Sequence, residues 1–68
     1  MLNIHFNGKQ VKVAEGTTLA ELLESHRISR RNLFVDWNDT ILYGNDDLEH
    51  RLLSNGDRVN LFSMVGGG

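Results

Sequence analysis

The sequence predicts a single α+β domain in which four or five strands pack on one main helix. Three observations lead to this fold class. Apolar residues alternate with polar ones in several short segments, one segment has helical spacing behind a capping signal, and Asn-Gly pairs at 7–8 and 55–56 mark turns. With 68 residues, the chain lies near the lower size limit for a domain that folds without disulfides or metal.

The first predicted element is a β-hairpin. Apolar residues alternate along residues 2–6, and Val11 and Val13 continue the alternation after Asn7-Gly8. Asn-Gly favours a two-residue type I′ turn, because both central positions of that turn need a positive φ. We therefore expect two antiparallel strands with one apolar face.

The main helix is predicted to begin at residue 18. Thr18 and Glu21 have the spacing of a capping box, in which side chains bind the free N–H groups of the first helical turn. The apolar stripe of this helix is formed by Leu19, Leu22, Leu23 and His26. This stripe would cover the apolar face of the hairpin.

A third strand is predicted over residues 33–37, where Leu33, Val35 and Trp37 alternate with other residues. Asn38-Asp39 forms a turn, and residues 40–42 are expected to be a short continuation.

A short helix is then predicted over residues 48–53. Asp46 or Asp47 would cap it, and Leu48 and Leu52 would anchor it. Asn55-Gly56-Asp57 is the last turn, and a final strand over 58–65 leads into the glycines at 66–68. We expect residues 1–65 to form the domain and residues 66–68 a flexible tail.

Composition narrows the possible functions. The chain has no cysteine, so a thiolate metal site and a thiol nucleophile are excluded. Its formal net charge of −2 argues against a nucleic-acid or membrane partner. The first residues have no basic region and no long apolar run, so we expect no signal peptide and a cytoplasmic protein.

The order of these motifs resembles the ubiquitin-like β-grasp sulfur carriers, most closely the ThiS family. The resemblance spans essentially the whole chain and rests on Asn7-Gly8, residues 16–23, Trp37-Asn38-Asp39, residues 55–59 and Val65-Gly66-Gly67-Gly68. It implies a mixed sheet in which the first and last strands are central and parallel. The chain departs from the usual pattern with aromatic residues at Phe34 and Trp37 and with His26 where Leu is expected.

The resemblance also implies a function. In that family an adenylating enzyme, ThiF-like and related to ubiquitin-activating enzymes, uses ATP and Mg to convert the terminal glycine into an acyl-adenylate. Sulfur from a cysteine desulfurase or another donor then gives a thiocarboxylate, which a ThiG-like thiazole synthase consumes. Gly68 would be the modified residue, and Gly66 and Gly67 would deliver it. The carrier would be a protein co-substrate that binds no cofactor, not an enzyme.

The period of two along the last strand suggests a docking face for these partners. Val59 and Leu61 should face the core, which leaves Phe62 and Met64 on the opposite face, with Phe34 joining them if the third strand keeps its register.

Other candidate sites are weaker. The three histidines lack metal-ligand spacing. Asp46, Asp47 and Glu49 are better explained by a helix N-terminus than by a cation site. Arg30-Arg31 is either a solvated loop or a contact for an acidic partner.

Two alternative functions remain open. The small subunit of molybdopterin synthase is also a Gly-Gly thiocarboxylate carrier, although such subunits tend to be longer and often have proline before the glycines. A non-covalent TGS-like binding module has a similar hairpin and helix start, but it would give the terminal glycines no role.

Overall fold

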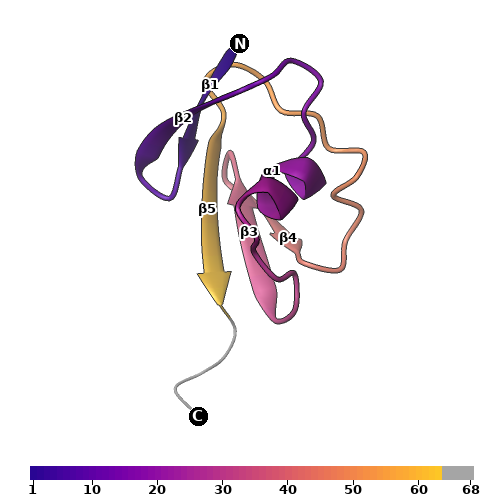
Figure 1. Ribbon diagram of the computed structural model, residues 1–68. Coiled ribbons are helices and arrows are strands. Elements are labelled where there is room, and N and C mark those ends of the chain that lie inside the picture. Colours follow the sequence, from indigo (N-terminus) through magenta and orange to yellow (C-terminus); the bar gives the residue numbers. More distant parts are fainter. Residues whose placement is uncertain (64–68) are drawn as a thin grey trace.

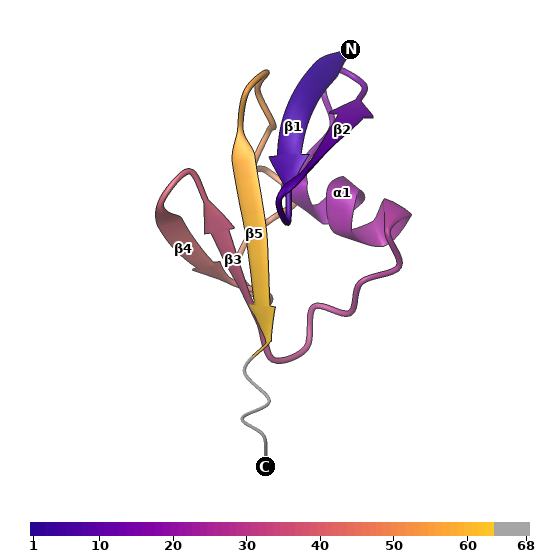
Figure 2. The same ribbon diagram turned by 90° about the vertical axis from the view of Figure 1, so that its left-hand side faces the viewer.

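The computed structural model describes residues 1–63 and contains a five-stranded mixed sheet packed against one helix (Figure 1). The strands lie in the order β2-β1-β5-β3-β4, and β1 pairs in parallel with β5. Seen from the side in Figure 1, α1 lies on one face of this sheet, and Figure 2 shows the sheet from the opposite face. The predicted β-grasp fold is confirmed.

The first hairpin forms as predicted, from β1 (Leu2–Phe6) and β2 (Lys9–Val13). Asn7 and Gly8 adopt φ values of 51° and 81°, which is the requirement of a type I′ turn. The register pairs Ile4 with Val11, so both side chains lie on the core face.

The helix α1 (Leu19–Ser25) begins with the predicted capping box. The backbone N–H of Thr18 donates to Glu21 Oε1 at 2.9 Å, and the N–H of Glu21 donates to Thr18 Oγ1 at 3.2 Å. The leucine stripe is buried, whereas His26 is the exposed C-cap residue and places its ring 4.6 Å from the ring of Phe6. An imidazole is accommodated here because it packs at the edge of the core.

The strand β5 (Arg58–Ser63) is fixed to β1 by asparagine side chains at both ends of a short pairing. Asn55 Oδ1 accepts the N–H of Asn3 at 2.8 Å, and Asn7 Oδ1 accepts the N–H of Leu61 at 2.8 Å. Each asparagine therefore serves a turn and also holds the register of the parallel pair.

The third strand, β3 (Leu33–Trp37), pairs with β5 on one side and with β4 (Thr40–Tyr43) on the other. Residues 40–42 are therefore part of a returning antiparallel strand and not a continuation of β3. Asn38 and Asp39 both have a positive φ, at 50° and 70°, which reverses the chain in two residues.

The short helix predicted over residues 48–53 is wrong, since this segment is a loop with one turn. Leu48 is fully buried, but Leu52 is 59% exposed and forms a β-bridge with Thr18. The carbonyl of Arg51 accepts the N–H of Leu19, and the carbonyl of Leu48 accepts the N–H of Ala20. The backbone carbonyls of the loop therefore accept hydrogen bonds from the free N–H groups in the first turn of α1, and do not form hydrogen bonds within a helix of the loop itself.

A buried carboxylate joins the turns at one end of the sheet. Asp57 Oδ2 accepts Trp37 Nε1–H at 3.0 Å and the N–H of Ser54 at 2.8 Å, while Oδ1 accepts from Asn38 Nδ2 at 2.9 Å. Burial raises the pKa of Asp57, but the hydrogen bonds from Ser54, Asn38 and Trp37 outweigh it, and the pKa lies below its usual value. We call this group, Trp37, Asn38, Ser54 and Asp57, the corner.

Among residues 1–63, no helix has the length and apolar character needed to cross a bilayer.

Candidate functional site

The candidate site begins at the end of β5, the strand that leads toward the predicted reactive tail. Ser63, the last described residue, pairs with Leu33 at the start of β3. Met64, Gly66, Gly67 and Gly68 lie outside the described residues, so their predicted roles stay predictions.

The predicted docking residues Phe62 and Phe34 lie on the face of the sheet opposite α1. Val59 is fully buried and Leu61 packs against the core, so alternation along β5 turns Phe62 outward, where it is 54% exposed. Phe34 is the direct cross-strand partner of Phe62. The placement of Phe62 and Phe34 on one face is confirmed, and their binding role stays a prediction.

The sequence interpretation missed Ile41 and Tyr43, which extend this apolar surface. They are 54% and 50% exposed, and Tyr43 pairs with Phe34 with ring centroids 5.0 Å apart. The signal was available, because a hairpin turn at Asn38-Asp39 would have given Ile41 and Tyr43 the same outward phase as Phe34. We call Phe34, Ile41, Tyr43 and Phe62 the outer patch.

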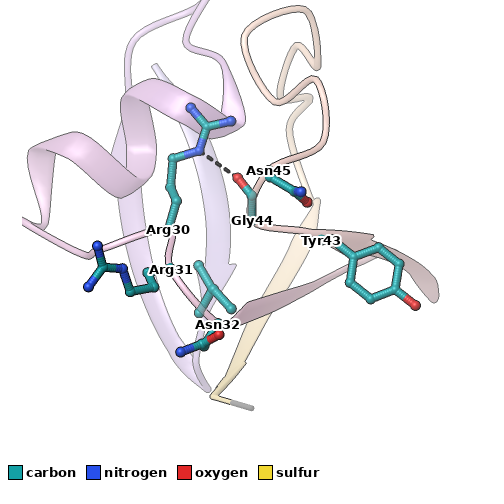
Figure 3. Close-up of a pocket in the computed structure, with 7 residues that line it drawn as sticks. Arg30, Arg31, Asn32, Tyr43, Gly44 and Asn45 are labelled. Carbon is teal, nitrogen blue, oxygen red and sulfur yellow. Dashed lines mark hydrogen bonds between the residues drawn. The ribbon is translucent and has the colours of Figure 1, made fainter. Parts of the chain in front are cut away.

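A pocket of about 310 Å³ opens beside the start of β3, close to the end of β5. Figure 3 shows Arg30, Arg31 and Asn32 on one side of it and Tyr43, Gly44 and Asn45 on the other. Arg31 is exposed, and its guanidinium points away from that of Arg30 (Figure 3).

Arg30 is not a solvated loop residue, as one of the sequence interpretations had it. Its Nε donates to the carbonyl of Gly44 at 2.7 Å (Figure 3). One Nη donates to the carbonyl of Asp46 at 2.9 Å. The other Nη forms an ion pair with Glu49. Arg30 therefore links the loop before β3 to the loop after β4. Of the two arginines, Arg31 is the one whose charge is exposed to solvent.

The acidic residues of this loop have separate partners. Asp46 Oδ2 accepts the N–H of Tyr43 at 2.7 Å, and Asp47 lies 2.8 Å from His50 Nδ1. The hydrogen bond with His50 lowers the pKa of Asp47, and the hydrogen bond from Arg30 lowers that of Glu49. Their explanation as residues of a helix N-terminus is wrong, because no helix follows. Within residues 1–63 no group of His, Asp and Glu side chains has the arrangement of a metal site.

The described surface thus has an apolar patch on the open face of the sheet, spread over β4, β3 and β5.

Comparison with known proteins agrees with this architecture. The model of the ThiS family matches residues 4–68, which includes the terminal glycines. A crystal structure of the thiamine biosynthesis protein ThiS from Geobacter metallireducens superposes with a TM-score of 0.81. It is 27% identical, and the match covers 98% of this chain and 100% of that chain. No curated protein sequence matches. The chain belongs to the ThiS family of small sulfur carrier proteins.

Proposed function

We propose that Gly68 of this chain is adenylated and then converted to a thiocarboxylate, which donates sulfur to thiazole synthase in thiamine biosynthesis. The observation that supports this most strongly is the family match, which extends through Gly66, Gly67 and Gly68. The similar structure from Geobacter metallireducens is described as a thiamine biosynthesis protein, which favours thiazole formation over molybdopterin synthesis.

The chemistry requires an unhindered carboxylate. An α-carboxyl group has a reference pKa of about 3.3–3.7 and is ionised at neutral pH. Its oxygen attacks the α-phosphate of ATP, pyrophosphate leaves, and an acyl-adenylate forms. Sulfur at the oxidation level of sulfide then attacks the acyl carbon and AMP leaves. Glycine has no Cβ, so a run of glycines can enter a narrow active site where another residue would clash.

In these reactions the partner enzymes bind ATP and Mg and deliver the sulfur, and the carrier contributes only its terminal acyl group. Because adenylation consumes ATP, the proposal assigns the carrier to the cytoplasm. The folded domain, residues 1–65 in the proposal, would dock through the outer patch and Met64. Residues 64–68, the five that follow β5, span at most about 17 Å when extended. The docking surface must therefore lie close to the end of β5.

Intact mass spectrometry tests the proposal. The full chain is incubated with ATP, Mg, the adenylating enzyme of the same organism and a sulfur donor. We expect a mass increase equal to the exchange of one oxygen for sulfur, and we expect none when ATP is omitted or when Gly68 is deleted. The enzyme is first shown to be active on another carrier. If the mass of this chain then never changes, the proposal is contradicted.

A non-covalent binding module is the competing function from another class. It predicts that deletion of Gly68 leaves partner binding and biological activity unchanged. Growth of a carrier-deficient strain without thiamine separates the two, since the proposal requires Gly68 for growth and the module does not.

A further inference from the structure

The outer face of the sheet carries one acidic side chain within its apolar part. Asp36 lies on β3 two residues after Phe34. Its side chain faces outward because the preceding residue, Val35, is buried on the core face and side chains alternate along a strand. In the register, Asp36 stands between Ile41 on β4 and Asn60 on β5. It is therefore next to the outer patch on the central strand of β5, β3 and β4.

This carboxylate is unusual in its hydrogen bonding. Asp36 Oδ1 is buried, and within residues 1–63 it has no hydrogen-bond partner. A buried carboxylate oxygen without a partner costs folding free energy, so such atoms are rare in folded proteins and need a specific explanation. By contrast, both carboxylate oxygens of the buried residue Asp57 have partners.

The arginine of β5 on this face has an ion-pair partner of its own. Arg58 also points outward on β5, but it forms its ion pair with Asp39 at the Asn38-Asp39 turn, 3.4 Å away. Among the ion pairs of residues 1–63, none includes Asp36. Within residues 1–63, Asp36 Oδ1 therefore has no donor, and a docking protein could supply one.

We propose that Asp36 receives an arginine side chain of the adenylating enzyme when the two proteins dock through the outer patch. This inference rests on the proposed function, which supplies the partner. A guanidinium fits because it is planar, binds a carboxylate through two hydrogen bonds and stacks on aromatic rings such as Phe34 and Phe62. The apolar side chains of the patch would exclude water from the ion pair, as in the central part of many protein interfaces.

The test compares Asp36→Asn with Glu24→Gln. Both substitutions remove one negative charge, but Glu24 is an exposed residue of α1, on the other face of the sheet. Binding to the purified adenylating enzyme is measured by titration calorimetry at low and high salt, together with the thermal unfolding midpoint, Tm. We expect Asp36→Asn to weaken binding by about thirtyfold or more and to reduce its salt dependence, because the loss of one member of a buried charge pair is costly.

The free protein should respond in the opposite sense. Because the unpartnered carboxylate costs folding free energy, the Tm of Asp36→Asn should equal or exceed that of the unaltered chain. Glu24→Gln should leave both Kd and Tm nearly unchanged.

Three results would overturn the inference. A lower Tm for Asp36→Asn would mean that the carboxylate is paired within the chain. An unchanged Kd would exclude the ion pair, and weaker binding only to thiazole synthase would assign it to a different partner. These failures are distinct from failure of the proposed function. If the unaltered chain still gains the oxygen-to-sulfur mass change while Asp36→Asn binds normally, the carrier function stands and only the role of Asp36 is lost.

Discussion

The corner and the outer patch both include side chains of β3, but the carboxylate at the corner and the carboxylate beside the outer patch differ in their hydrogen bonding. At the corner, the Asp57 carboxylate accepts three hydrogen bonds, one of them from the indole N–H of Trp37. Beside the outer patch, Asp36 has a buried oxygen without a partner in residues 1–63, and Phe62 in the patch is more than half exposed.

This difference separates stability from recognition. Trp37 and Asp36 are neighbours on β3, so a single strand serves the corner with one side chain and the outer face with the next. Groups whose hydrogen bonds are complete within the chain stabilise the fold. Apolar and charged groups that remain incomplete on the open face are available to a partner. Substitutions in the two regions should therefore change different measured quantities.

The largest effect is expected at Gly44, where one substitution should reduce both stability and partner binding. A Cβ placed on Gly44 would lie 1.9 Å from the backbone oxygen of Arg30, and backbone cannot move aside as a flexible side chain can. Gly44→Ala should cost about 3 kcal/mol of unfolding free energy. Because Gly44 directly follows Tyr43 of β4, partner binding should weaken as well.

Gly56→Ala is the matched control for this substitution. Its φ is +88°, but nothing lies within 4 Å of the added Cβ, so only backbone strain of about 1–2 kcal/mol is expected. Urea unfolding of both variants measures the difference. Equal losses would show that the close approach of Gly44 to Arg30 does not constrain the fold.

Asp57→Ala should have the next largest effect, and it should affect stability alone. The substitution leaves the donors of Trp37, Asn38 and Ser54 without their acceptor, which should cost about 2–3 kcal/mol. For a domain of this size, each kcal/mol lowers Tm by about 4–8 °C. The Kd for the adenylating enzyme, measured below the Tm of the variant, should stay unchanged, and a tenfold loss of affinity would place the corner in the interface.

The pH dependence of stability should reveal the same carboxylate. The native pKa of Asp57 is lowered from 3.8, so its contribution is present above the unfolded pKa and is lost as pH falls through the native value. The difference in unfolding free energy between the unaltered chain and Asp57→Asn should therefore be constant above about pH 5 and shrink below about pH 4. A difference that grows on acidification would have the wrong sign. The subtraction cancels the contributions of Asp47 and Glu49, whose pKa values are also lowered.

Phe62→Lys should have the smallest effect on stability and a clear effect on binding. Phe62 is 54% exposed, so its replacement should change the unfolding free energy by only about 0.5 kcal/mol. A lysine in the outer patch should weaken binding of the adenylating enzyme at least tenfold. Leu52→Lys is the control, because Leu52 is equally exposed at 59% but lies in the loop that caps α1. A large loss of Tm in Phe62→Lys would instead assign Phe62 to the core.

The sequence was sufficient for features that depend on local pattern. The Asn7-Gly8 turn, the capping box at Thr18 and Glu21, and the outward phase of Phe62 each follow from neighbouring residues, and the structure has all of them. These features place one face of the sheet under α1 and leave the other face open.

Features that depend on distant partners could not be predicted. Residues 48–53 have helical spacing, but their carbonyls accept hydrogen bonds from α1, which precedes them by about thirty residues in the sequence. In the same way, the residues around Arg30 in the sequence do not predict its hydrogen bonds to Gly44 and Asp46. The residues around Asp36 do not predict that its Oδ1 is buried.

The most direct test measures Tm and Kd on the same preparations of Asp36→Asn and Asp57→Asn. Both substitutions replace a carboxylate by an amide, but the Asp57 carboxylate is hydrogen-bonded through both oxygens, whereas Asp36 Oδ1 has no partner within residues 1–63. We predict that Asp36→Asn weakens binding of the adenylating enzyme without lowering Tm, and that Asp57→Asn lowers Tm without weakening binding. If both variants lose the same quantity, whether stability or affinity, the corner and the outer patch do not have separate roles.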